Sequence, residues 1–150
     1  MMSGLYKKIL IATDGSEYTK KAVAHAIELA KLSGAELHAI YVVDIKAGCG
    51  PESCISMEVS PDRIARILSR HGDAAIHYIE DLANKEGIKT ERWIVEGNPA
   101  EEILKFANKQ SVDLIVMGTL GMSGIEKFLL GSVADKVIRS SKTPVLTVRK

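Results

Sequence analysis

Short apolar runs that alternate with segments of helical spacing are the feature of this chain that most limits its fold. The first run, residues 8–14, is flanked by charge and is typical of a central strand buried on both faces. The strand-like runs fall at 8–14, 36–43, 90–95, 113–118 and 143–149, and the helical segments at 17–33, 60–87, 98–110 and from 132 onward. The alternation predicts an α/β fold: a doubly wound, five-stranded parallel sheet with strand order 3-2-1-4-5, Rossmann-like, with helices on both faces.

No repeat or linker interrupts this pattern, so one domain spanning residues 1–150 is expected. Residues 44–60 are predicted as a loop because they contain several glycines and a proline. The next helix should start at Pro61, after the Ser60 cap, stop at Gly87 and overhang the sheet at one end. Its predicted buried face consists of Ile64, Ile67, Leu68, Ala75, Ile79 and Leu82. The helix at 98–110 should begin at the Asn98 cap and bury Ile103, Leu104 and Ala107.

Composition and charge exclude several classes of partner. A formal net charge of +1 gives no electrostatic basis for binding nucleic acid. No apolar run reaches the roughly 18 residues that a membrane span requires. With two cysteines and no export signal, the expected location is the cytoplasm.

The predicted topology places a ligand crevice between the first and fourth strands. In doubly wound sheets ligands bind beyond the carboxyl ends of the strands, where the strand order reverses. Here that crevice would be bounded by Ala12-Thr13-Asp14 on one side and by residues 118–121 on the other. Asp14 has a second interpretation, as a turn-forming residue before Gly15.

A glycine motif follows the fourth run and ends where the last helix begins. Its spacing is Gly-x2-Gly-x9-Gly-Ser, formed by Gly118, Gly121, Gly131 and Ser132. It matches neither Gly-x-Gly-x-x-Gly nor Gly-x4-Gly-Lys-Ser/Thr. Exposed amides at a helix start, the helix dipole and one hydroxyl are suited to phosphate, whereas the alternative is that the glycines only permit tight turns and close packing.

With these residues in place, the chain resembles the universal stress protein family along almost its whole length. The resemblance is carried by residues 7–16 (KKILIATDGS), 41–44 (YVVD), 97–100 (GNPA) and 113–118 (DLIVMG), together with the glycine motif. The complete motif resembles that of the family's ATP-binding branch.

The resemblance implies a nucleotide site, residue by residue. Ala12, Thr13 and Asp14 would line the adenosine end, and the main chain of Val42 would meet the adenine. Met117 and Gly118 would lie near the ribose. The phosphates would be held by Gly121, Gly131, Ser132 and Val133, with Ala134 adjacent. The implied ligand is ATP, or AMP or ADP, with Mg²⁺.

The family also forms homodimers through its last strand, here Val145 to Val148. Pairing with a twofold mate would cover an apolar edge strand that is otherwise an aggregation hazard. The sequence departs from the family at Leu120 and Met122, where members often carry a His and a basic residue. The nearest cation in the sequence is Lys127, so AMP, ADP or another nucleotide stays open alongside ATP.

No set of residues has the pairing that catalysis would need, and no catalytic residue is therefore predicted. Cys49 and Cys54 are interpreted as inert thiols, a redox pair or a partial metal site, in that order, and no metal site is predicted. The predicted function is a stress-response regulator acting as a nucleotide-dependent dimeric switch with an unknown protein partner. The alternatives are a slow ATPase and a nucleotide-free interaction module whose Cys49–Cys54 loop responds to oxidants.

Overall fold

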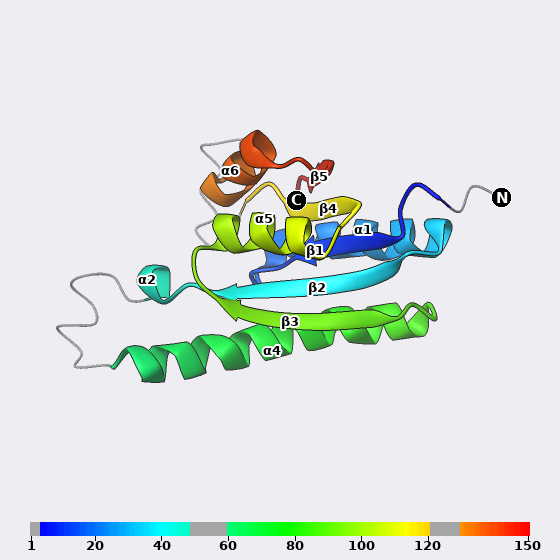
Figure 1. Ribbon diagram of the computed structural model, residues 1–150. Helices are drawn as coiled ribbons and strands as arrows, with labels where there is room; N and C mark the ends of the chain where they lie inside the picture. Colours follow the sequence, from blue (N-terminus) through cyan, green and yellow to red (C-terminus); the bar gives the residue numbers. More distant parts are fainter. Residues whose placement is uncertain (1–3, 49–59, 121–129) are drawn as a thin grey trace.

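The computed structural model describes residues 4–48, 60–120 and 130–150. Strands and helices alternate along these residues (Figure 1). Their bounds are β1 (Lys8–Ala12), the 3₁₀ turn η1 (Glu17–Thr19), α1 (Lys20–Ser33), β2 (Glu36–Val43), α2 (Ile45–Gly48), α4 (Pro61–Lys85), β3 (Thr90–Glu96), α5 (Pro99–Lys109), β4 (Leu114–Gly118), α6 (Ser132–Ser140) and β5 (Val145–Val148).

The sheet has five strands in the order β3-β2-β1-β4-β5, and every pairing is parallel. β1 is central, and its residue Ile9 pairs with Leu37 of β2 and Leu114 of β4. Because β1 has helices on both sides, Ile9, Leu10 and Ile11 are fully buried. The predicted fold class and strand order are confirmed.

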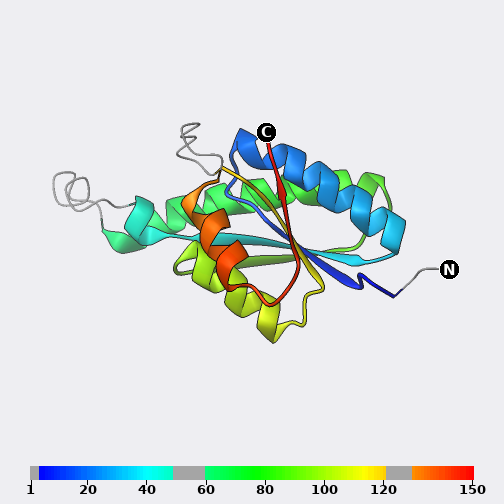
Figure 2. The same cartoon turned by 90° about the horizontal axis from the view of Figure 1, so that it is seen from above.

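Two helical layers cover the sheet. Ile9 and Ile11 pack in a core with residues of α1 and α4, whereas Leu10 and Ala12 pack in a second core with residues of α5 and α6. This split follows from the strand geometry, in which successive side chains point to opposite faces. Figure 1 shows α5 and α6 on the opposite side of the sheet from α4. The C-terminus lies beside the start of α1 (Figure 2), where the Lys150 ammonium is 4.8 Å from the ring centroid of Tyr18.

Some details differ from the sequence prediction. The first turn of the predicted loop 44–60 is the short helix α2, and the Asp44 carboxylate accepts a hydrogen bond from the Ala47 amide (3.2 Å). Residues 49–59 of that loop lie outside the described residues. In α4, Ile67 was predicted to be buried but is 54% exposed. The overhang of α4 was correctly predicted (Figure 1), and near its amino end Ile67 is left uncovered.

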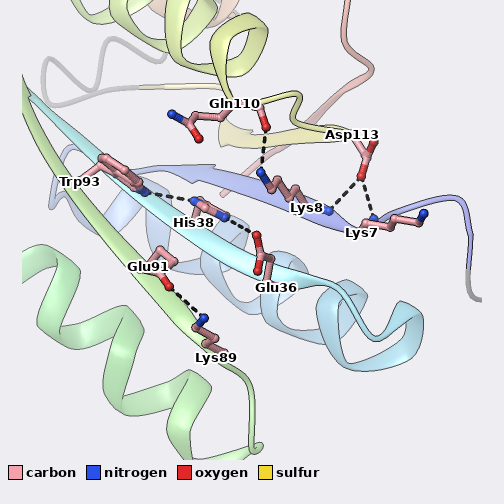
Figure 3. A network of polar contacts seen from close by, with 9 residues as sticks. All are labelled: Lys7, Lys8, Glu36, His38, Lys89, Glu91, Trp93, Gln110 and Asp113. Carbon is pink, nitrogen blue, oxygen red and sulfur yellow. Dashed lines mark hydrogen bonds and ion pairs between the residues drawn. The ribbon is translucent and has the colours of Figure 1, made fainter.

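The amino-terminal end of the sheet is held by polar contacts (Figure 3). The Asp113 carboxylate accepts hydrogen bonds from the amides of Lys7 (2.8 Å) and Lys8 (2.9 Å). β4 begins just after it, at Leu114, one residue later than predicted. The indole of Trp93 donates to Nδ1 of buried His38 (3.0 Å), and Nε2 of His38 therefore carries the proton and donates to Glu36 (2.9 Å). These contacts fix the amino-terminal end of the sheet. The loops at the carboxyl ends of the strands remain available to form a site. No helix in the described part of the chain is long and apolar enough to cross a membrane.

Candidate functional site

A cavity of about 530 Å³ opens at the carboxyl ends of β1, β2 and β4. It lies where the connections of adjacent β1 and β4 leave for opposite faces of the sheet, which is the predicted position. The predicted site residues that line it are Ala12, Thr13, Asp14, Val42, Met117, Gly118, Gly131, Ser132, Val133 and Ala134. Gly121 lies outside the described residues. Four separate chain segments thus meet at one cavity, although their role in nucleotide binding stays a prediction.

The loop after β1 is shaped by its own side chains. The hydroxyl of Thr13 accepts a hydrogen bond from the Gly15 amide (3.0 Å) and lies 3.3 Å from the hydroxyl of Thr19. Thr19 in turn donates to the carbonyl of Ser16 (2.8 Å). The Asp14 carboxylate accepts from the Ser16 amide (2.9 Å), so Asp14 fills the turn-forming role and also lines the cavity.

The end of β2 supplies a second wall. Tyr41 is buried there, Val42 is half-buried, and both line the cavity with Asp44. Burial raises the pKa of the Tyr41 phenol, and the nearby Asp14 carboxylate raises it further because a phenolate would be repelled. Tyr41 therefore offers a neutral wall rather than an anion.

Gly118 and Gly131 are glycines for different reasons. A Cβ on Gly118 would lie 2.9 Å from the carbonyl oxygen of Tyr18, so close packing requires glycine there. Gly131 has φ −72°, which any residue adopts, and is the N-cap of α6. Its amide donates to the Thr119 carbonyl. Backbone conformation does not explain glycine at position 131, which is consistent with close approach by a ligand.

The start of α6 faces the cavity. Ser132, Val133 and Ala134 form its first turn and line the cavity, and the N-cap residue makes no side-chain capping bond. The first amides of an α-helix have no acceptor within the helix and lie at the positive end of its dipole. This arrangement is a suitable site for an anionic group.

The charged side chains of the described lining are Asp14 and Asp44, with no Lys, Arg or His among those residues. Leu120, where family members often carry a polar residue, is part of this lining. Met122, Lys127, Cys49 and Cys54 lie outside the described residues. Within the described ranges no cluster of three or more His, Cys, Asp or Glu residues could hold a metal ion.

Several lining residues were not predicted. Tyr41 and Asp44 flank Val42 within the YVVD run and could have been found from its place at a strand end beside β1. Leu68 of α4 also lines the cavity, but nothing near it in the sequence signals this position. The remaining unpredicted lining residues are Thr19, Ile40, Ala47, Pro99 and Ile103, whereas Thr119 and Leu120 fall within the predicted boundary 118–121.

Comparison with known proteins identifies the family. The sequence model of the Universal stress protein family matches residues 5–149. Universal stress protein MJ0531 of Methanocaldococcus jannaschii is 45% identical over 146 residues, which cover 97% of this chain and 84% of that protein.

Solved structures agree with this assignment. The structure of MJ0577, a protein of Methanocaldococcus jannaschii, superposes with a TM-score of 0.82 at 33% identity and covers 98% of both chains. A universal stress protein solved in complex with cAMP superposes with a TM-score of 0.70 at 30% identity, covering 97% of this chain and 98% of the other. On the sequence match, the identity and the shared fold together, this chain belongs to the universal stress protein family.

Proposed function

We propose that this universal stress protein binds ATP or a related adenine nucleotide in the cavity between β1, β2 and β4. The observation that carries the proposal is the convergence of the predicted residues from four chain segments on one cavity that ends at the start of α6. The volume of about 530 Å³ falls within the usual range of small-molecule sites, roughly 300–1,000 Å³. The relative that was solved with cAMP supports an adenine nucleotide as the ligand.

The ligand would lie with its base against the apolar wall and its phosphate at α6. Ile40, Val42 and Ile103 form part of that apolar wall. Asp14 lies toward the ribose end in this arrangement, and the amides of the first α6 turn receive the phosphate. Each part of the nucleotide would thus meet a matching chemical surface.

The number of phosphates that the bound nucleotide can carry depends on the charge of the cavity lining. With two carboxylates and no cationic side chain in the described lining, a polyphosphate needs neutralisation from elsewhere. Oxygen ligands suit Mg²⁺, but Asp14 and Asp44 alone do not form a closed metal site. Mg²⁺ would therefore arrive with the phosphates, and we expect ATP binding to depend on Mg²⁺ more strongly than AMP binding does.

We infer a regulatory role, as a dimeric switch in the cytoplasmic stress response. The main chain of Thr119 connects the site to the sheet edge: its carbonyl accepts from the Gly131 amide, and its own amide donates to the carbonyl of Val148 (3.2 Å). A phosphate at Gly131 would therefore act on β5, the strand proposed to form the homodimer. A protein partner would recognise the altered surface.

A slow ATPase is the second candidate, and the described lining argues against it. Hydrolysis needs a group that neutralises transition-state charge, such as Arg or Lys, and the described lining has neither. Turnover above that of a Gly131→Val, Ser132→Ala double variant would favour the enzyme. The redox module is a third candidate, tested by peroxide treatment and mass spectrometry for loss of two hydrogens at Cys49–Cys54.

The binding proposal is tested with purified protein and one matched pair of variants. Denatured protein is extracted for nucleotide chromatography, and thermal shifts are recorded with millimolar ATP and Mg²⁺. Gly131→Val places a branched side chain beside the α6 amides and should abolish binding while the protein stays folded. Gly4→Val is the control, because among the described residues only chain neighbours of Gly4 lie within 4 Å of its Cβ position. An empty extract together with no thermal shift would refute nucleotide binding.

A further inference from the structure

The loop between β1 and α1 forms one wall of the proposed nucleotide cavity and contacts α4 on its other side. Thr13, Asp14 and Thr19 line the cavity. On the α4 side, Nε2 of His71 lies 3.2 Å from the main-chain oxygen of Asp14. A carbonyl oxygen only accepts, so Nε2 carries the proton and donates it to this loop.

His71 is exposed as a whole, and its ring contacts Gly15 of the loop and Tyr41 of the sheet. Gly15 has φ +79°, and a Cβ there would lie 2.5 Å from Nε2 of His71. On its other side the ring meets Tyr41 edge to face, with centroids 5.8 Å apart. Tyr41 itself lines the nucleotide cavity. His71 thus contacts two walls of that cavity, the β1–α1 loop and Tyr41, from outside the cavity. The ring fits beside the loop because Gly15 has no side chain.

Beside His71, the same loop is loosely packed against α4. A second cavity of about 190 Å³ lies between them, lined by Thr13, Gly15, Ser16, Thr19, Lys20, His71, Ala74, Ala75 and Tyr78 among others. The hydroxyl of Ser16 is buried and has no hydrogen-bond partner among the described residues. Because a void replaces close packing here, apolar contacts fix the position of this loop weakly. The His71 hydrogen bond is then the polar tie from α4 to the wall formed by Thr13 and Asp14.

We propose that His71 is a positioning residue for nucleotide binding: by donating to the carbonyl of Asp14 it holds the β1–α1 loop in the geometry that the ligand requires. The inference rests on the proposed function, since it names a further residue for that same site. His71 is absent from the lining of the nucleotide cavity and acts through Asp14.

The test compares two substitutions at His71 with a matched control on the same helix. His71→Phe keeps an aromatic ring against Tyr41 but removes the donor, whereas His71→Gln keeps an N–H donor near the position of Nε2. His77→Phe is the control, because the His77 side chain is 70% exposed and its Nε2 lies near Asp81 of the same helix (3.4 Å), away from the β1–α1 loop. Affinity for ATP with Mg²⁺ and for AMP is measured by calorimetry, and unfolding by urea denaturation.

We expect His71→Phe to weaken binding of both nucleotides about fivefold to tenfold, the effect of one lost hydrogen bond. His71→Gln should stay within about twofold of wild type, and His77→Phe should bind normally. In nucleotide-free His71→Phe, the amides of Gly15 and Ser16, which are held by Thr13 and Asp14, should exchange hydrogen faster.

The outcomes separate this inference from the proposed function. If wild type binds nucleotide and His71→Phe binds equally well, the positioning role is wrong while the site stands. If His71→Gln binds nucleotide as weakly as His71→Phe, the ring contributes by packing and not by donating a hydrogen bond to the loop. That result also overturns the inference. If wild type binds no nucleotide, the proposed function fails and the inference fails with it.

Discussion

At the scale of single residues, Glu36 shows how a contact far from the cavity sets a pH response. The hydrogen bond from His38 lowers the pKa of Glu36 most, burial opposes this to a smaller extent, and the positive charges of Lys8 and Lys89 add still smaller lowering effects. A pKa lowered by folding gives stability that is present above the unfolded pKa and is lost as pH falls through the folded pKa. Glu36→Gln removes this dependence while keeping an acceptor for His38.

We therefore expect wild type to be more stable than Glu36→Gln at neutral pH, with the gap closing as the solution is acidified below the folded pKa of Glu36. Urea denaturation across a pH series measures both free energies of unfolding. A gap that stays constant down to the acid limit would contradict the assigned pKa shift.

Gly118 gives the second residue-scale prediction. Its substitution by Ala would bring a Cβ to 2.9 Å from the Tyr18 carbonyl oxygen, and a backbone atom cannot rotate away. We expect Gly118→Ala to lower the free energy of unfolding by about 1–3 kcal/mol, the usual cost of overpacking. Gly4→Ala, with open space around it, is the control, and equal stability of the two variants would show that the β4 end relaxes freely.

At the scale of elements, α5 depends on its amino-terminal cap. The Asn98 side chain accepts a hydrogen bond from the Glu101 amide (3.1 Å), and Pro99 occupies the first turn. Asn98→Ala should cost about 1 kcal/mol of stability, whereas Asn98→Asp should retain it. Because Pro99 and Ile103 of α5 line the cavity, the Ala variant should also bind nucleotide more weakly. Chemical denaturation and calorimetry measure the two effects, and an Asp variant as unstable as Ala would argue against the cap.

The elements also show what could be read from the sequence and what could not. Caps such as Asn98, apolar runs such as β1 and the position of the glycine motif are local signals, and they predicted the sheet, its strand order and about half of the cavity lining. Ile67, Leu68 and His71 lie on one helix with similar local spacing, yet one is exposed, one lines the cavity and one holds the β1–α1 loop. Their roles depend on where α4 meets the sheet, which is a long-range property that local pattern does not encode.

At the scale of the whole molecule, the edge strand β5 decides how two chains could join. The carbonyls of Pro144 and Val148 accept hydrogen bonds from the amides of Ile115 in β4 and of Thr119 just after it, so these residues direct their main-chain groups inward. Alternate residues of a strand share this direction, and therefore Val145 and Thr147 present their amides and carbonyls to the open edge. The proposed homodimer would pair through these groups.

Thr147→Pro follows as the sharpest test of that dimer. Proline removes an amide that faces away from β4, and edge strands tolerate this substitution because no ladder bond within the subunit is lost. We expect wild type to sediment as a dimer and Thr147→Pro as a folded monomer in analytical ultracentrifugation. The monomer should still bind nucleotide, because the link from the Gly131 turn through Thr119 to Val148 lies within one subunit. Nucleotide should no longer shift an equilibrium between monomer and dimer. A Thr147→Pro protein that remains dimeric would place the interface on another surface, and the link from phosphate to β5 would then lose its regulatory role.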